Sequence, residues 1–174
     1  MARSIFLTLT LSSLLVGAGC ASLPKTGEQA APSLDSSRIA KLDHELERET
    51  DSDRISNLLF ERGHAYLEGA ESLRAARRDA GGTEYGTLIL HALRDFEMVV
   101  GDFPDTAQAP EALFHLGAIY DYPNIASFGP ALRYYQQTIS DCPGTESALK
   151  ARQAIRIIED NVKQVTDGAH GGGG

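Results

Sequence analysis

A stretch of this chain occurs twice, at a separation of 39 positions. The matched pairs are Ala92 with Ala131, Phe96 with Tyr135, Pro104 with Pro143, and Ala112 with Ala151. A fixed separation of this size is typical of a helical hairpin that stacks on a copy of itself. The repeat therefore predicts a scaffold built from successive helical hairpins.

A second spacing indicates that the first copy is longer than the next. The matched pairs, 54 positions apart, are Phe60 with Phe114, Gly63 with Gly117, and Tyr66 with Tyr120. Compared with the 39-residue unit, the first copy therefore carries about 15 extra residues. We expect them between Glu68 and Tyr85.

Apolar residues recur at helical intervals through most of the chain. This periodicity predicts helices at about 53–79, 89–103, 109–120, 131–142 and 148–165. No segment alternates with a period of two for long enough to form a strand. We therefore expect an all-α protein whose domain, at 53–166, has about two hairpins and a closing helix.

Local signals refine this arrangement. Pro104 should end the second helix, and Asp105 or Thr106 should cap the third. Small residues at repeat positions should let two backbones approach closely, while aromatic side chains fill the remaining space. The small residues are Gly63, Gly117, Ala92 and Ala131, and the aromatic ones are Phe60, Phe96, Phe114 and Tyr135.

The order Leu116-Gly117-x-x-Tyr120, Ala131-x-x-x-Tyr135 and Pro143 resembles the tetratricopeptide repeat consensus. Residues 103–117 resemble the variety of this repeat found in bacterial outer-membrane barrel-assembly lipoproteins and in periplasmic proteins that work beside the Tol-Pal system. The resemblance covers about 60–166 and implies a short right-handed α-solenoid that binds other proteins. Its consensus residues are Phe60, Gly63, Tyr66, Ala92, Phe96, Pro104, Leu116, Gly117, Tyr120, Ala131, Tyr135 and Pro143.

The N-terminus resembles the signal peptide of a bacterial lipoprotein, at 1–19. Its apolar run, from Ile5 to Val16, is too short to span a membrane. The run leads to Gly17-Ala18-Gly19-Cys20, which resembles a lipobox although Gly17 stands where leucine is usual. The alternative is an ordinary signal peptide cut nearby.

The lipobox resemblance implies that Cys20 is acylated, with palmitate among its chains, and becomes the first mature residue. Several acyl chains together hold a protein durably on a membrane. Ala21, which follows the cysteine, favours the outer membrane, with the domain facing the periplasm. Residues 20–52 should form a flexible tether, in which Ile39, Leu42 and Leu46 could form a short helix. The glycine-rich segment 167–174 should be disordered.

Charge and composition exclude several functions. The formal net charge is −8 at pH 7, so nucleic-acid phosphates would repel the chain. It contains no phosphate-binding glycine loop and no Gly-x-Ser-x-Gly motif. The histidines indicate no metal site, and we expect neither a cofactor nor catalysis. The histidines are His44, His64, His91, His115 and His170.

Two features indicate binding to other proteins. Tyr122, Ile125 and Phe128 lie in a long connection between helices and are candidate contacts, with Tyr122 preferred over Phe128. The last helix carries a narrow apolar seam, which either caps the short array or is completed by a partner or a second copy. The seam residues are Ala148, Ala151, Ile155, Ile158, Val162 and Val165.

We expect the partners to be other envelope proteins, in a complex that resembles barrel assembly. Alternatives are a motility, type IV pilus, secretion or cell-division complex. A different class of function is the binding of peptidoglycan or small ligands in the periplasm.

Overall fold

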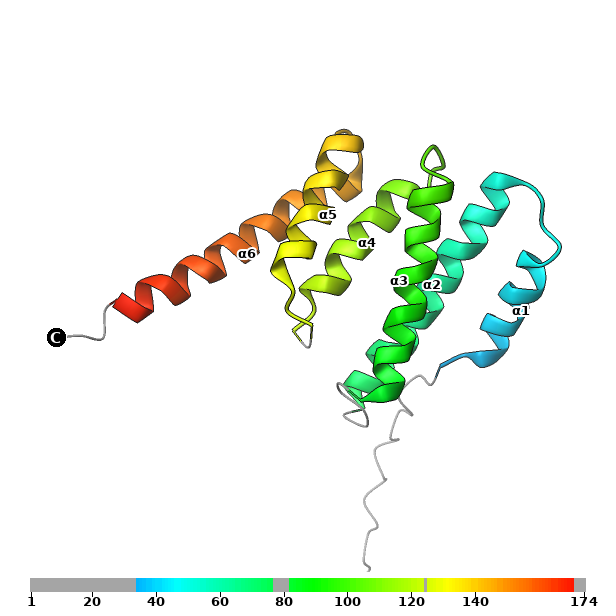
Figure 1. The fold of residues 1–174 in the computed structure, drawn as a ribbon, viewed down its shortest axis with the longest axis horizontal. Coiled ribbons are helices and arrows are strands. Elements are labelled where there is room, and N and C mark those ends of the chain that lie inside the picture. The colour runs from blue at the N-terminus through cyan, green and yellow to red at the C-terminus, as the bar shows by residue number, and fades with distance from the viewer. Residues whose placement is uncertain (1–33, 77–81, 124, 171–174) are drawn as a thin grey trace, which may run out of the picture.

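The computed structural model describes residues 34–76, 82–123 and 125–170. These residues form six α-helices and no strand (Figure 1), which confirms the all-α class. The predicted signal peptide at 1–19, Cys20 and residues 171–174 lie outside the described residues. The helices are α1 (Ser36–Leu46), α2 (Ser52–Ala75), α3 (Thr83–Asp102), α4 (Ala109–Asp121), α5 (Phe128–Asp141) and α6 (Glu146–His170).

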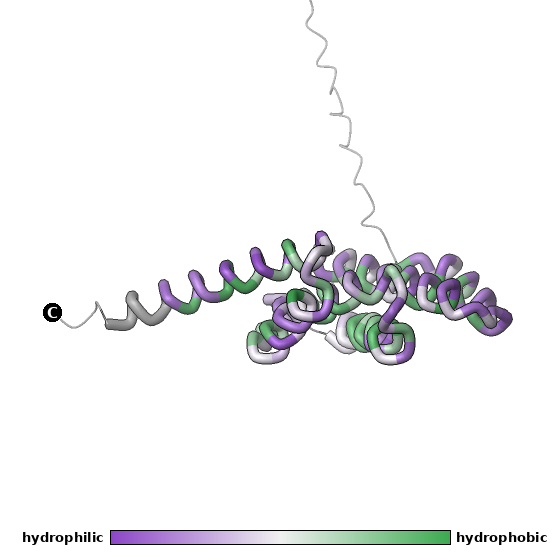
Figure 2. Tube along the Cα trace, turned by 90° about the horizontal axis from the view of Figure 1, so that it is seen from above, coloured by the Kyte–Doolittle hydropathy of each residue, from purple (hydrophilic) through white to green (hydrophobic). Residues whose placement is uncertain are grey.

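Successive helices run in opposite directions, and each packs on the next. α6 packs on α5 and also reaches α4. Its C-terminal part projects away from the other helices, both in Figure 1 and in the view from above (Figure 2). The described residues thus form one row of antiparallel helices that ends in a projecting helix.

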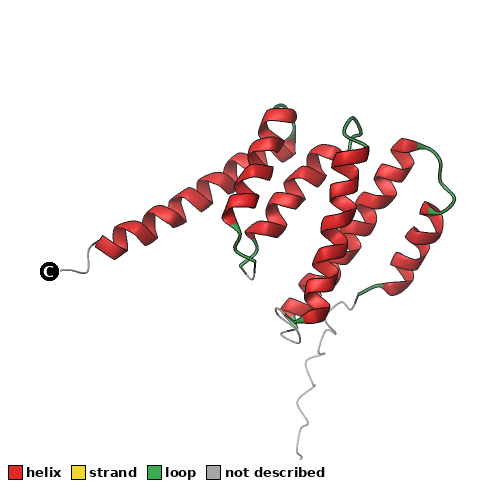
Figure 3. Ribbon diagram, in the orientation of Figure 1, coloured by secondary structure: helices red, strands yellow, loops and turns green. Residues whose placement is uncertain are grey.

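The extra residues of the first copy lengthen both of its helices. α2 and α3 contain 24 and 20 residues, whereas α4 and α5 contain 13 and 14 (Figure 3). The longer helices bury additional apolar side chains in the larger of two cores. These side chains include Leu67, Ala70, Tyr85, Leu88 and Ile89.

A glycine lies against an aromatic ring where the helices of each hairpin cross. A Cβ atom added to Gly63 would lie 2.9 Å from Cε1 of Phe96, and one added to Gly117 would lie 2.7 Å from Cδ1 of Tyr135. Carbon atoms in favourable contact are about 3.5–4.0 Å apart. A larger residue at either position would therefore displace the ring.

The two copies differ in the size of their cores. Ala92 and Phe96 have no exposed surface and belong to the larger core, which α2, α3 and α4 share. The smaller core consists of Ala131, Tyr135, Ala151 and Ile158, with Phe114 and Tyr120 packed against it. The second hairpin thus depends on α6 for much of its burial.

A buried ion pair connects α1, α2 and α3. Arg62 donates to Asp95 through Nε at 2.8 Å and Nη2 at 2.6 Å, and to Asp43 of α1 through Nη1 at 2.6 Å. The Asp95 side chain is only 3% exposed. The hydrogen bonds to Asp95 and Asp43 raise the pKa of the Arg62 guanidinium. Bidentate pairs of this kind are among the strongest polar contacts in proteins.

α1 belongs to the packed domain, not to a flexible tether. Ile39 and Leu42 are buried, and the helix packs on α2. Asp35 caps its N-terminus by accepting a hydrogen bond from the Arg38 amide at 3.0 Å. The tether predicted at 20–52 is therefore too long at its C-terminal end, because a short amphipathic helix within it docks on α2.

Two other boundaries also differ from expectation. α6 continues to His170, so the predicted end of the domain at 166 and the first four residues of the predicted tail, 167–170, fall within a helix. Thr106 does not cap α4, because its hydroxyl hydrogen-bonds to the Phe103 carbonyl and to Ser56. Its counterpart Thr145 does act as a cap, accepting from the Ala148 amide at 3.2 Å.

Candidate functional site

The candidate contact residues after α4 do not share one environment. Tyr122 and Ile125 are partly buried against the larger core. Burial raises the pKa of the Tyr122 hydroxyl, which donates a hydrogen bond to Glu71 of α2. Phe128 is 43% exposed at the start of α5. Tyr122, which the sequence favoured as a contact, is thus less exposed than Phe128, because the long α2 provides a hydrogen-bond partner for it.

The apolar seam of α6 is buried at one end and exposed at the other. Ala148 and Ala151 have no exposed surface, and Ile158 is 3% exposed. Val162 follows Ile158 by four positions and so lies on the same helix face. Nevertheless its exposure is 48%. The seam therefore continues past the part of α6 that the rest of the chain covers.

A shallow groove lies beside this seam, between α5 and α6. Ile139 and Ile155 give it an apolar surface, and two exposed residues, Arg152 and Arg156, also line it. Hydrophobic residues recur at regular intervals along the projecting part of α6 (Figure 2). Such a surface suits an apolar side chain flanked by carboxylates.

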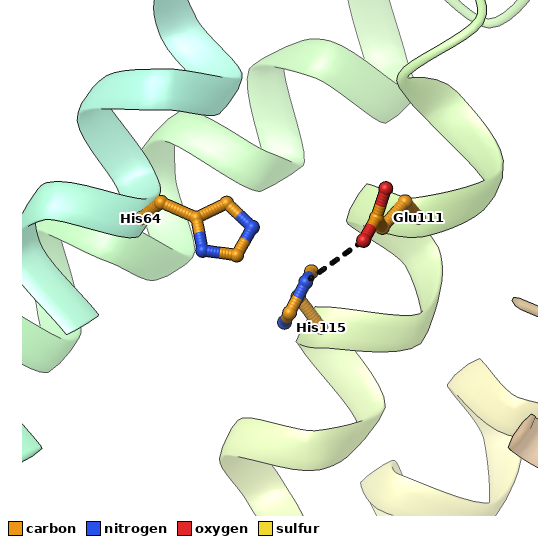
Figure 4. Close-up of side chains that lie close together, drawn as sticks. All are labelled: His64, Glu111 and His115. Atoms are coloured by element: carbon orange, nitrogen blue, oxygen red, sulfur yellow. Dashed lines mark ion pairs between the residues drawn. The ribbon is translucent and has the colours of Figure 1, made fainter. Parts of the chain in front are cut away.

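A second cluster of interest lies between α2 and α4. His64 of α2 points toward His115 and Glu111 of α4 (Figure 4). One potential ligand atom from each side chain lies within 4.8 Å of the others. Nε2 of His115 lies 3.8 Å from Oε1 of Glu111.

Aromatic rings surround the two imidazoles. The rings of His64 and His115 meet edge to face, with centroids 4.4 Å apart. The His115 ring stacks on Phe96 at a centroid distance of 5.2 Å and an interplanar angle of 15°. Phe60 meets His64 edge to face at 4.7 Å. The cluster thus adjoins the crossing of Gly63 and Phe96.

Burial keeps both imidazoles neutral near pH 7. It is the main cause that lowers the pKa of His64, and together with His64 and Lys150 it lowers the pKa of His115 to about 4. Nε2 of His115 is buried and has no hydrogen-bond partner among the described residues. A buried polar atom without a partner costs about 1–3 kcal/mol.

The sequence contains only part of the signal for this cluster. Glu111 and His115 stand four positions apart, which places them on one face of a helix. The expectation that the histidines form no such arrangement overlooked this pair. His64 comes from another helix, and only the packing of α2 near α4 brings it close.

Within the described residues, no helix has the length and apolar character needed to cross a membrane. The chain matches no protein-family model, no curated protein and no solved structure. Helices are the only regular secondary structure in the part of the chain that the structure describes.

Proposed function

We propose that this protein is a non-enzymatic, lipid-anchored scaffold of the bacterial outer membrane that binds another envelope protein. One observation supports the location of the proposed binding surface. The seam of α6 is 3% exposed at Ile158 and 48% exposed at Val162, one turn further along the same face. An apolar face that continues beyond its own core indicates a surface that a partner covers.

The repeat supports a scaffold of the tetratricopeptide type. The glycine and aromatic residues of the consensus meet at both crossings, Gly63 with Phe96 and Gly117 with Tyr135. In this proposal the helices form a short right-handed α-solenoid. Repeat arrays of this kind present extended surfaces to other proteins.

The proposed partner element is an amphipathic helix with an apolar face and acidic flanks. Ile139 and Ile155 would receive its apolar side chains, and Arg152 and Arg156 would pair with its carboxylates. A helix laid along a groove is a common mode of recognition between proteins. The apolar groove would supply most of the affinity, and the arginines would orient the bound helix.

The membrane anchor in this proposal is Cys20. Its support is the resemblance of Gly17-Ala18-Gly19-Cys20 to a lipobox, after an apolar run too short to span a bilayer. Acylation would hold the domain at the outer membrane, on its periplasmic side. The partner would then be a membrane-associated or periplasmic protein.

The binding surface is tested by two matched substitutions on α6. Val162→Asp places a carboxylate in the proposed surface, whereas Ile157→Asp places one on the other side of the same helix. Both side chains are about half exposed, at 48% and 52%, so neither change should alter the melting temperature by more than a degree or two. A photo-crosslinker at each position, used in cells, identifies the partner.

We expect a crosslink to a specific envelope protein from position 162 and not from 157. Val162→Asp should abolish co-purification of that protein, while Ile157→Asp should leave it intact. Equal crosslinking from both positions, or full binding by Val162→Asp, would contradict the assignment of this surface.

The anchor is tested with the two cysteines of the chain. Cys20→Ser should abolish incorporation of labelled palmitate and release the protein from the membrane fraction. Cys142→Ser is the matched control, because Cys142 lies at the end of α5 and should not affect lipid attachment. Labelling that persists in Cys20→Ser would refute the anchor without affecting the binding surface.

A further inference from the structure

Among the described residues, one group of side chains has the donor atoms of a transition-metal site. It consists of His64 on α2 and of Glu111 and His115 on α4 (Figure 4). Imidazole nitrogen and carboxylate oxygen are common ligands of zinc in proteins. Two imidazoles with one carboxylate supply three ligands, which leaves a fourth tetrahedral position for water or another ligand.

Aromatic stacking accounts for the face of the His115 ring but not for Nε2 on its edge. His115 stacks on Phe96 through its face, at an interplanar angle of 15°. A metal ion binds in the plane of an imidazole, at a nitrogen on its edge, so stacking and coordination do not compete. A metal ion at Nε2 of His115 would provide the interaction that this buried atom lacks within the described part of the chain.

The separations of the donor atoms are close to those of a closed site. Zinc lies about 2.0–2.2 Å from nitrogen and oxygen ligands, so two ligands of one tetrahedral ion are about 3.4 Å apart. Nε2 of His115 and Oε1 of Glu111 are 3.8 Å apart, and all three donor atoms lie within 4.8 Å of one another. Rotation of the half-exposed Glu111 and of the His64 ring can close the remaining gap.

Charge and protonation also fit a cation. Glu111 supplies a negative charge, and burial keeps both imidazoles unprotonated at neutral pH, as metal binding requires. Glu68 lies near His64 and adds a second carboxylate, whereas Arg38 near His64 and Lys150 near His115 oppose binding. The cluster therefore favours a tightly coordinated divalent ion over one held by charge alone.

We propose that His64, Glu111 and His115 bind one zinc ion, or a similar divalent transition-metal ion, that links α2 to α4. These two helices each pack on α3, and their backbones make few close contacts with each other. The ion would brace the junction between the two hairpins. Its open fourth position would remain available to a ligand from solvent or from a partner.

The test is a zinc titration of the full chain, purified in mild detergent and stripped with EDTA. We expect one zinc ion to bind per chain and the melting temperature to rise with zinc concentration. Cobalt in the same site should give the visible absorption bands of a tetrahedral complex. Magnesium and calcium should have no effect, because they prefer oxygen ligands.

The decisive variants are Glu111→Gln and His64→Ala, each expected to weaken zinc binding by about 10-fold or more. Glu111→Gln keeps the shape of a side chain that is 48% exposed, so it should fold like the original protein. The control is His91→Ala, which removes an exposed histidine that stacks on Tyr66 outside the cluster.

The proposal is overturned if zinc does not bind, or if Glu111→Gln and His64→Ala bind it as tightly as the original chain. It is also overturned if His91→Ala loses as much affinity as they do. Because the titration uses the purified chain alone, its outcome is independent of partner binding through α6.

Discussion

The two helical hairpins share one crossing but differ in the residues beside it. In each hairpin, a glycine of the first helix lies against an aromatic ring of the second, Gly63 against Phe96 and Gly117 against Tyr135. This contact requires that one partner have no side chain, and both copies of the repeat carry glycine at that position. The crossing alone therefore cannot explain why the two hairpins have different surroundings.

The difference comes from the residues that precede the glycine and the ring. In the first hairpin they are Arg62 and Asp95, which form a buried ion pair. In the second hairpin the same repeat positions carry Leu116, which is buried, and Tyr134, which stacks on Tyr120. The same hairpin geometry thus accommodates either charged or apolar and aromatic residues at these two positions.

The two ends of the row are covered in different ways. Arg62 reaches Asp43, so the first hairpin holds a helix of its own chain, α1, through the same polar contact. The second hairpin is covered by α6, whose apolar face runs beyond it. The first end is therefore closed by α1, while the other end leaves apolar surface exposed on α6.

The largest expected effect is the loss of the ion pair. Asp95→Ala leaves Arg62 mostly buried with only Asp43 as a partner, and removing one member of a buried pair costs about 3–5 kcal/mol. Tyr134→Ala, at the same repeat position of the second hairpin, removes a partly exposed stacked ring and should cost less. Urea unfolding of both variants measures the difference.

A double substitution sharpens this comparison. Arg62→Leu with Asp95→Tyr copies the second hairpin into the first and leaves no buried charge unpaired there. It should therefore be more stable than Asp95→Ala alone. If the double variant is the less stable of the two, the ion pair is not interchangeable with the apolar contact.

The second effect is the pH dependence that His115 introduces at the junction of the hairpins. Its pKa is lowered from 6.5 to about 4 in the folded state, so between these values the unfolded chain binds more protons. Stability is therefore lost as the pH falls from about 6.5 to about 4, by at most about 3 kcal/mol. Unfolding is measured by urea titration at several pH values in EDTA.

His115→Phe provides the comparison for this effect, because it keeps a ring against Phe96 and removes the titrating group. The first hairpin has the exposed Glu61 at the equivalent position. We expect a smaller loss of stability between pH 6.5 and 4 in the variant. A pH profile identical to that of the original chain would assign the acid sensitivity to other groups.

The third effect concerns the crossings themselves. Gly117→Ala should destabilise the protein by about 1–3 kcal/mol, because the new Cβ would lie 2.7 Å from the Tyr135 ring. Gly63→Ala should cost less, since its distance to Phe96 is 2.9 Å. The hydroxyl of Tyr135 is also held by Asp121, which restricts retreat of that ring. Thermal unfolding ranks the two variants.

Gly101→Ala is the control, because an added Cβ meets no atom within 4 Å in α3. This variant should be unchanged or slightly more stable, since alanine favours a helix over glycine. If all three alanine variants behave alike, the glycines matter for helix propensity and not for close packing.

The smallest effect lies in the connection that closes the second hairpin. Ala126 has φ 43°, in the left-handed region that favours glycine. Ala126→Gly should therefore stabilise the protein by about 0.5–1 kcal/mol. Ala154→Gly, within α6, should instead destabilise it. Differential scanning calorimetry distinguishes the two signs.

Sequence patterns predicted the parts of the fold that depend on short spacing. Five of the helices follow from apolar periodicity, because a helix that packs along one face repeats its apolar residues every three or four positions. The extra length of the first copy also follows from comparing the spacings of Gly63 and Phe96 with those of their counterparts. The spacings do not indicate which residues the extra segment contacts. The burial of Tyr122 beside α2 therefore could not be predicted from them.

Contacts between distant polar residues could not be predicted in this way. Arg62 and Asp95 come from different helices and have no polar counterparts in the second copy, so the repeat gives no signal for them. The approach of His64 to Glu111 likewise depends on the packing of α2 near α4. Both contacts require knowledge of which helix faces meet.

The projecting end of α6 has a consequence for its dynamics. From residue 159 onward every described side chain of this helix is exposed. The helical conformation of this part is therefore stabilised by extension of the packed turns before it and not by packing of its own. Its amide protons should exchange with solvent faster toward His170, whereas those near Ala151 are protected by packing. A partner bound along α6 would slow this exchange, and the last protected amide would mark how far the partner extends.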